Sequence, residues 1–164
     1  MAGLIVRASR VDDAGAIAAL SNYYIRETAV HFGLHELEPS YFAQIIERDS
    51  AMYPWVTAEV DGRFAGFAKA GLWREREAYA KTVESAVYVE RGMEGKGVGR
   101  ALYGVLLDEL RRRGFHTVVA GATMPNEGSV RLHESVGFEF VGRFREVGRK
   151  MGAWHDVGWW QLML

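Results

Sequence analysis

The stretch "VERGMEGKGVGRALY", residues Val89–Tyr103, sets four glycines among charged residues directly before an apolar helical pattern. Glycine weakens strand and helix interiors alike, so another requirement explains its density here. A glycine-rich turn between a strand and a helix points backbone N–H groups at a common centre, and the helix dipole adds positive potential there. Phosphate is therefore the natural ligand for such a loop.

Two well-known phosphate loops do not fit this spacing. The dinucleotide fingerprint needs a third glycine, but that position holds Arg100 or Leu102, depending on which glycine pair starts the count. The P-loop needs Ser or Thr after Gly-Lys, but Lys96 is followed by Gly97. The spacing alone leaves two readings open, a phosphate-binding loop and a flexible connection with solvated charges.

The hydrophobic periodicity around the loop predicts a mixed α/β domain in the order β-α-α-β-β-β-α-β-α-β-β. Asp-Gly at 61–62 lies between two β-type runs and is a strong hairpin signal. Asp12 and Asn126 are expected to be N-caps, and Gly114 and Gly137 to end helices. Strands are expected at 4–9, 55–60, 64–73, 83–90, 116–122, 138–148 and 154–164, and helices at 11–28, 38–50, 98–113 and 126–138.

The composition, with 164 residues, 49% hydrophobic and 25% charged, is that of one ordinary globular domain spanning 1–164. A formal net charge of −1 gives no indication of nucleic acid or a membrane surface as partner. The absence of cysteine excludes disulfides, thiolate metal sites and a cysteine nucleophile. The sequence has no H-E-x-x-H metal spacing, G-x-S-x-G elbow, signal-peptide pattern or apolar run of about 18 residues. We expect a soluble, cytoplasmic, metal-free protein.

The segment from Glu94 through Gly97 and Gly99 resembles Q/R-x-x-G-x-G/A, the acetyl-CoA pyrophosphate signature of the GNAT superfamily of N-acetyltransferases. "YPWVTAEVDG", "TVESAVYV", "NEGSVRLHESVGF" and "GAWHDVGWWQL" are similar to its phosphinothricin acetyltransferase branch, which includes the methionine sulfone and sulfoximine acetyltransferases. The resemblance covers nearly the whole chain. It implies the GNAT fold, a mixed sheet of about seven strands splayed in the middle, with about four helices. Glu94 departs from the usual Gln or Arg.

The resemblance implies that acetyl-CoA is the cosubstrate. Its pantetheine arm would pair with the backbone of Val87, Tyr88 and Val89. Asn126 would bond the arm from the far side or serve only as a helix cap; a cap uses the side-chain oxygen and leaves the NH2 free, so both roles are compatible. Gly99→Val would crowd the loop against the pyrophosphate, which the resemblance assigns to Gly95, Lys96, Gly97, Val98, Gly99 and Arg100.

Two side chains are candidates for the chemistry. Strand alternation puts Glu84 on the face of Ala86 and Tyr88, and the resemblance makes it the general base, acting directly or through water. The alternative is a solvated Glu on an amphipathic strand. His133 stands where many of these enzymes carry a Tyr near the thioester sulfur, so a histidinium would donate to the leaving thiolate. The alternative is a helix-surface His bonded to local carbonyls. A backbone N–H at Val87 or Tyr88 would meet the oxyanion.

The segment "GLWREREAYAKTVE" resembles the substrate loop of the family. Guanidinium groups form paired bonds to carboxylate, phosphinyl and sulfonyl oxygens, and aromatic rings would wall an aliphatic chain. The alternative is a charged surface loop whose arginines pair with neighbouring glutamates. A weaker similarity in "RETAVHF" adds two residues from the end of the first helix. The candidate substrate residues are Trp73, Arg74, Glu75, Arg76, Tyr79, Glu27 and Phe32.

The resemblance further implies a homodimer, with Lys150, Trp154, His155 and Asp156 near the partner's substrate pocket, although His155-Asp156 also fits a structural turn pair. The expected activity is transfer of the acetyl group from acetyl-CoA to the α-amine of a small glutamate-like amino acid, by direct attack in a ternary complex. Phosphinothricin, methionine sulfoximine and methionine sulfone are the candidate acceptors. The alternatives are another amine (antibiotic, polyamine or peptide N-terminus) and a silent acyl-CoA-binding module.

Overall fold

Seven strands form one sheet in the order β1-β2-β3-β4-β5-β7-β6 in the computed structural model, which describes residues 3–164. All neighbours are antiparallel except β4 and β5. The strands are β1 (Leu4–Ala8), β2 (Trp55–Val60), β3 (Arg63–Leu72), β4 (Thr82–Val89), β5 (Thr117–Met124), β6 (Glu139–Lys150) and β7 (Ala153–Met163). The helices are α1 (Ala14–Glu27), α2 (Pro39–Asp49), α3 (Val98–Arg112) and α4 (Glu127–Ser135). The predicted fold is confirmed.

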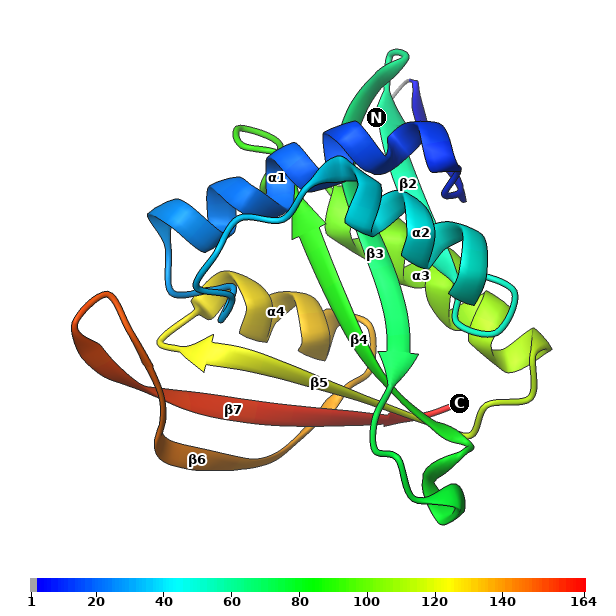
Figure 1. Cartoon of the computed structure of the whole chain (residues 1–164). Helices are drawn as coiled ribbons and strands as arrows, with labels where there is room; N and C mark the ends of the chain where they lie inside the picture. Colours follow the sequence, from blue (N-terminus) through cyan, green and yellow to red (C-terminus); the bar gives the residue numbers. More distant parts are fainter. Residues whose placement is uncertain (1–2) are drawn as a thin grey trace.

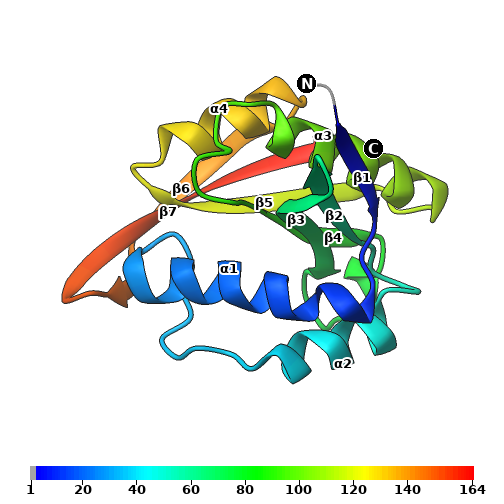
Figure 2. The same ribbon diagram turned by 90° about the horizontal axis from the view of Figure 1, so that it is seen from above.

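The helices cover both faces of the sheet, with α1 and α2 on one side and α3 and α4 on the other (Figures 1 and 2). The apolar stripe of α3 is buried against the sheet as its spacing predicts, with Leu102, Leu106 and Leu110 fully enclosed. On the opposite face, α1 and α2 pack around Trp55 and Phe67, whose rings are stacked. The two cores hold the central strands of the sheet between them.

The start of the first helix differs from the prediction. The chain enters α1 through a 3-10 turn at Val11–Asp13, and Asp12 does not cap the helix. The neighbouring Asp13 carboxylate instead accepts the backbone N–H of Arg10 at 2.7 Å. Asp13 also lies next to the Arg7 guanidinium, and a strand-to-helix ion pair of this kind is not visible in local sequence. The expected caps at Asn126, Gly114 and Gly137 are confirmed.

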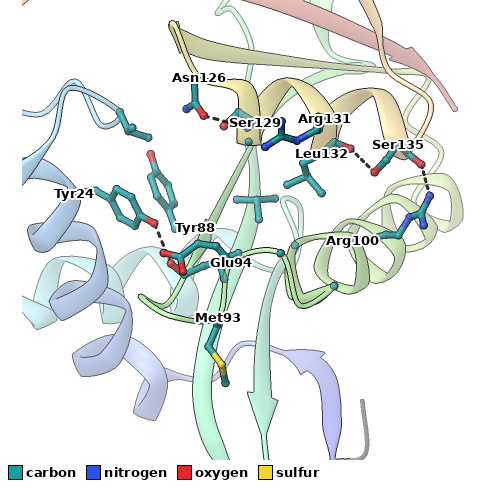
Figure 3. Close-up of a pocket in the computed structure, with 17 residues that line it drawn as sticks. Tyr24, Tyr88, Met93, Glu94, Arg100, Asn126, Ser129, Arg131, Leu132 and Ser135 are labelled. Atoms are coloured by element: carbon teal, nitrogen blue, oxygen red, sulfur yellow. Dashed lines mark hydrogen bonds between the residues drawn. The ribbon is translucent and has the colours of Figure 1, made fainter.

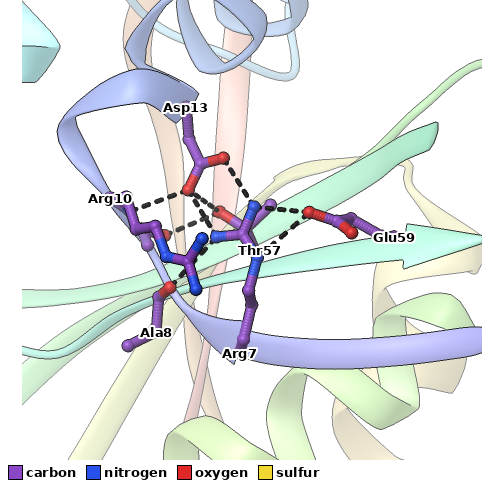
Figure 4. Close-up of polar contacts among 7 residues, drawn as sticks. Arg7, Ala8, Arg10, Asp13, Thr57 and Glu59 are labelled. Atoms are coloured by element: carbon purple, nitrogen blue, oxygen red, sulfur yellow. Dashed lines mark hydrogen bonds and ion pairs between the residues drawn. The ribbon is translucent and has the colours of Figure 1, made fainter. Parts of the chain in front are cut away.

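Arg7 links β1 to the 3-10 turn and to β2 (Figure 4). Its guanidinium makes two 2.8 Å bonds to Asp13 and also pairs with Glu59 on β2. Burial alone would raise the pKa of Asp13. The bonds from Arg7 and from the Arg10 N–H outweigh it, so that pKa lies below its usual value. Arg7 therefore holds the first strand, the 3-10 turn and the second strand together.

We expect Arg7→Met to lower the free energy of unfolding by about 2 kcal/mol, because Asp13 would be left as a half-buried carboxylate without its cation. The carboxylate has a lowered pKa, so the stabilisation is present near neutral pH and is lost as pH falls through the native pKa. Urea unfolding at pH 7 and pH 3 measures both effects. Arg10→Met, which keeps the backbone N–H, is the control. Equal unfolding midpoints for the two variants at pH 7 would contradict this role.

Candidate active site

The sheet opens between its two central strands. β4 and β5 pair in parallel only from Thr82 to Glu84, opposite Thr117 to Val119. β4 then continues to Val89 while still paired with β3 on its other edge. The backbone groups of β4 beyond Glu84 therefore have no strand partner on the β5 side in the part of the chain described. The predicted splay is confirmed, and Glu84 stands where it begins.

The glycine loop connects the end of β4 to the start of α3. Gly95 and Gly97 have φ of +71° and +84°, in the left-handed region that L side chains rarely adopt. Gly97 is the N-cap of α3, and no side chain among residues 3–164 caps that helix end. The first amides of α3 therefore remain available to an external acceptor. A Cβ built at Gly95 or Gly97 would meet nothing within 4 Å, which leaves open space in front of the loop.

A cavity of about 510 Å³ lies against this loop (Figure 3). Its volume is within the range of small-molecule sites. Of the ten predicted cofactor residues, eight line it: Val87, Tyr88, Val89, Gly95, Gly97, Gly99, Arg100 and Asn126. The cavity is completed by side chains of α1, the loop after α1, the glycine loop and α4 that the cofactor prediction did not name, including Tyr24, Val30, Met93, Arg131, Leu132 and Ser135.

Lys96 and Val98 are the two predicted cofactor residues that do not line the cavity. The Lys96 side chain is exposed, and its Nζ lies 3.9 Å from the Met93 sulfur. Val98 is buried in the core below α3, so only its backbone N–H belongs to the loop surface. The charge expected from Lys96 is therefore not part of the cavity wall, whereas Arg100 is, with its guanidinium also donating to the Ser135 carbonyl at 2.9 Å.

Two polar side chains of the cavity have defined partners. Asn126 accepts the Ser129 N–H through Oδ1 at 3.1 Å, which caps α4 and leaves its NH2 group free. Glu94 accepts the Gly92 N–H at 2.7 Å. The departure from Gln or Arg at this position thus has a structural use, because the carboxylate closes the turn that precedes Gly95. It also keeps a negative charge at the cavity wall.

Gly99 lines the cavity and also lies close to α4. A Cβ there would lie 2.9 Å from Leu132 of α4, so the close approach concerns helix packing. Gly99→Val would therefore push the Leu132 side chain aside as well as crowd a ligand. Gly97 is the better test of the loop, since the space in front of it is open.

Glu84 lies on the sheet face covered by α1. Its cross-strand neighbour is Gly71, which adds no side chain over it, and its β5 neighbour is Val119. Burial raises the pKa of Glu84, while the positive charges of Lys69 and Arg74 oppose that rise. A carboxylate with a raised pKa at the mouth of a strand gap is suited to accept a proton.

His133 does not lie in the cavity wall. It is 6% exposed, its ring stacks on Trp160 with centroids 5.6 Å apart, and its Nε2 lies 2.9 Å from the Tyr103 hydroxyl. Burial lowers the pKa of His133 to about 4. Burial among aromatic rings disfavours the charged imidazole at neutral pH, so this environment does not favour a histidinium, and the role of His133 as an acid stays a prediction. The alternative of a helix-surface His is wrong, because the His133 side chain is buried.

Buried His133 and half-buried His31 predict a loss of stability in mild acid. The pKa of His31 is likewise lowered to about 4 by burial, with the charges of Lys69 and Lys150 adding to the effect. The unfolded chain takes up these protons near pH 6.5 and the native protein does not, so unfolding becomes easier as pH falls from 6.5 to 4. His133→Phe should remove on the order of 3 kcal/mol of this pH dependence. Thermal unfolding between pH 4 and 8 measures it; an unchanged slope in the variant would contradict a neutral His133.

The predicted substrate residues are not among those lining the cavity. Trp73 packs edge-on against Trp159 of β7 at 5.1 Å, and Arg74 lies over the Trp73 ring at 4.8 Å. No ion pair joins Arg74 or Arg76 to Glu75 or Glu77 in the described chain, so the alternative of locally paired arginines is not seen. Glu75, Arg76 and Tyr79 are exposed.

The two substrate residues predicted from the end of the first helix make different contacts. Glu27 is exposed and pairs with Arg26 at 2.7 Å. Phe32 packs over Gly148, where a Cβ would come within 2.2 Å of its ring, and near His155. The loop after α1 is thus fastened to β6 and β7. A Lys150 bond to the His31 carbonyl adds to this contact.

Trp159 and Trp160 face opposite sides of β7, as their adjacency predicts. Trp160 is buried beside His133, while Trp159 covers Gly121 of β5 on the Glu84 face. The indole N–H of Trp159 is buried and has no hydrogen-bond partner among residues 3–164. The Trp160 indole N–H and His133 Nδ1 are likewise buried and without a partner in this part of the chain.

Residues 3–164 contain no group of three or more His, Asp or Glu that could hold a metal ion. No helix in the described range has the length and apolar character needed to cross a membrane.

Known proteins are similar to this chain in fold and in sequence. The profile of the acetyltransferase (GNAT) family matches residues 17–138. A phosphinothricin N-acetyltransferase of Streptomyces viridochromogenes is 42% identical, over 95% of this chain and 85% of its own. An L-methionine sulfoximine/L-methionine sulfone acetyltransferase of Salmonella typhimurium is 35% identical, over 98% and 95%. An acetyltransferase structure from Salmonella typhimurium with its cofactor acetyl-CoA superimposes with a TM-score of 0.93 at 34% identity, covering 98% of this chain and 94% of that one.

The family resemblance seen in the sequence is confirmed, and the chain belongs to the acetyltransferase (GNAT) family of acetyl-transferring enzymes.

Proposed function

We propose that residues 1–164 form a single domain that transfers the acetyl group of acetyl-CoA to the α-amine of a small glutamate-like amino acid. Phosphinothricin, methionine sulfoximine and methionine sulfone are the candidate acceptors, supported by the relatives that carry those names. The observation that carries the proposal is the cavity between the glycine loop and the splayed strands, which brings together eight of the predicted cofactor residues.

The residues present fit acetyl-CoA. The open space before Gly95 and Gly97 and the uncapped amides of α3 would take the pyrophosphate, with Arg100 beside it. The unpaired edge of β4 at Val87–Val89 would pair with the pantetheine arm, and the free NH2 of Asn126 would bond it from α4. Acetyl-CoA supplies a thioester whose acyl carbon is open to attack by a neutral amine.

The acceptor amine would enter on the sheet face covered by α1, where Glu84 lies. Its carboxylate would take the proton from the amine, directly or through water, as the N–C bond forms and the C–S bond breaks. A backbone N–H at Val87 or Tyr88 would meet the oxyanion. The neutral, buried His133 would hold Tyr103 in place, and the thiolate would leave without a protein acid.

Arg74 and Trp73 are on the Glu84 side of the sheet and would bind the carboxylate and wall the aliphatic chain of the acceptor. The other predicted substrate residues remain candidates for a pocket completed by a second copy of the chain. They are Arg76, Glu75, Tyr79, Glu27 and Phe32. The exposed apolar side chains of β6, including Phe140, Val141 and Phe144, support a homodimer through this edge strand.

The test is to mix the protein with acetyl-CoA and a panel of amines, following thiol release and the mass of the product. Turnover with phosphinothricin, the sulfoximine and the sulfone, but not with peptides, polyamines or aminoglycosides, is the expected result. Turnover confined to one of the latter amines would move the acceptor to that class. Saturable acetyl-CoA binding without turnover on any amine would identify a silent acyl-CoA-binding module and overturn the enzyme.

A further inference from the structure

Lys69 is a lysine in the middle of the otherwise apolar strand β3. It lies on β3 opposite Ala86, two residues from Gly71, which pairs with Glu84. Side chains two apart on one strand share a face, so Lys69 and Glu84 are diagonal neighbours on the α1 side of the sheet. On the other edge of β3, Lys69 pairs with Trp55, and its Nζ lies over that ring at 5.1 Å.

The Lys69 ammonium has little else to compensate its burial. It forms no ion pair or side-chain hydrogen bond among residues 3–164, and its Nζ lies over the Trp55 ring. Burial lowers the pKa of Lys69, and the negative charge of Glu84 opposes that change. Burial raises the pKa of Glu84, and Lys69 opposes it more than Arg74 does. Each group thus favours the charged form of the other.

The other charged and titratable groups around Glu84 cannot replace Lys69. Arg74, from the loop after β3, is exposed and lies over Trp73, so solvent screens it. Tyr88 on β4 and His31 in the loop after α1 are neutral near pH 7, since burial raises the pKa of the first and lowers that of the second. Lys150 of β6 bonds the His31 carbonyl. The neighbouring strand β5 presents apolar Val119.

We propose that Lys69 is a positioning residue which, by its charge across β3 and β4, keeps Glu84 a carboxylate ready to accept the proton of the acceptor amine. The proposal rests on the assignment of Glu84 as general base under the proposed function. Lys69 itself exchanges no proton and touches neither reacting group.

The experiment compares Lys69→Met with two matched variants. Lys69→Arg keeps the charge on the same strand, and Arg63→Met removes an exposed charge from the start of β3. The first readout is the pH profile of kcat/KM. Lys69→Met should move its acid limb to higher pH, with about a tenfold loss at the acid end that shrinks above pH 8. Lys69→Arg should restore the limb, and Arg63→Met should leave it in place.

The second readout does not need turnover. A ¹³C NMR titration of the Glu84 carboxyl, assigned with Glu84→Gln, should show the midpoint moving upward in Lys69→Met and not in Arg63→Met. An unmoved midpoint in a folded Lys69→Met protein would overturn the proposal. If that midpoint moves but Glu84→Gln leaves the pH profile of the enzyme unchanged, the electrostatic coupling stands and the base assignment fails. The two failures are therefore distinguishable.

Discussion

Glu84→Gln is expected to lower kcat by about 100- to 10,000-fold, the usual contribution of a positioned general base. The amide keeps the size of the side chain and cannot accept the proton of the amine. Because burial raises the pKa of Glu84, the acid limb of the wild-type kcat/KM profile should lie above that of an ordinary glutamate, and the variant should lose this limb. Steady-state rates from pH 5 to 9 measure both effects.

Binding separates a lost base from a damaged fold. Acetyl-CoA affinity by calorimetry should be nearly unchanged in Glu84→Gln, since the cavity is lined beyond this residue on β4. Glu139→Gln, at an exposed position of β6, is the matched control and should keep wild-type rates. Wild-type kcat and an unaltered pH profile in Glu84→Gln would remove Glu84 from the role of base.

Gly97→Val is expected to weaken acetyl-CoA binding by about 100-fold. A β-branched side chain is strained at the φ of +84° that Gly97 adopts. Its methyl groups would also project into the open space before the loop, where the pyrophosphate is expected. Both effects act on the same N–H groups at the start of α3. Calorimetric titration with acetyl-CoA gives the dissociation constant directly.

A glycine elsewhere on α3 supplies the comparison. Gly104 is exposed, has open space around its Cα, and does not have a positive φ, so Gly104→Ala should bind acetyl-CoA as the wild type does. Wild-type affinity in a folded Gly97→Val protein would contradict the assignment of the loop. Gly99→Val would be a poor substitute, because its clash with Leu132 mixes a packing defect with any loss of binding.

The sequence predicted the parts of the site that are made locally. The glycine spacing, the strand before it and the Asn126 cap are all encoded within a few residues, and the structure places them around one cavity. The α3 stripe was equally predictable, because a period of 3.6 residues is a local property.

The errors concern contacts between distant segments. His133 is neutral because Trp160 and Tyr103 enclose it, and neither residue is near it in the sequence. The position of Lys69 beside Glu84 is not predictable locally, because a lysine between alanines gives no indication of its cross-strand neighbours. Its position within an otherwise apolar strand was the one available signal, since such a charge must find compensation when the strand is buried. The substrate loop stays a prediction.

The fastening of the loop after α1 to β6 also sets an order of assembly during synthesis. The bond from Lys150 to His31 spans 119 residues, and Phe32 seats on Gly148. A ribosome delivers the N-terminal helix long before β6 emerges, at about 5–20 residues per second. Until then, the loop that carries Phe32 has no β6 strand to pack against. The contact between this loop and β6 can therefore form only late in synthesis, after Lys150 has left the ribosome.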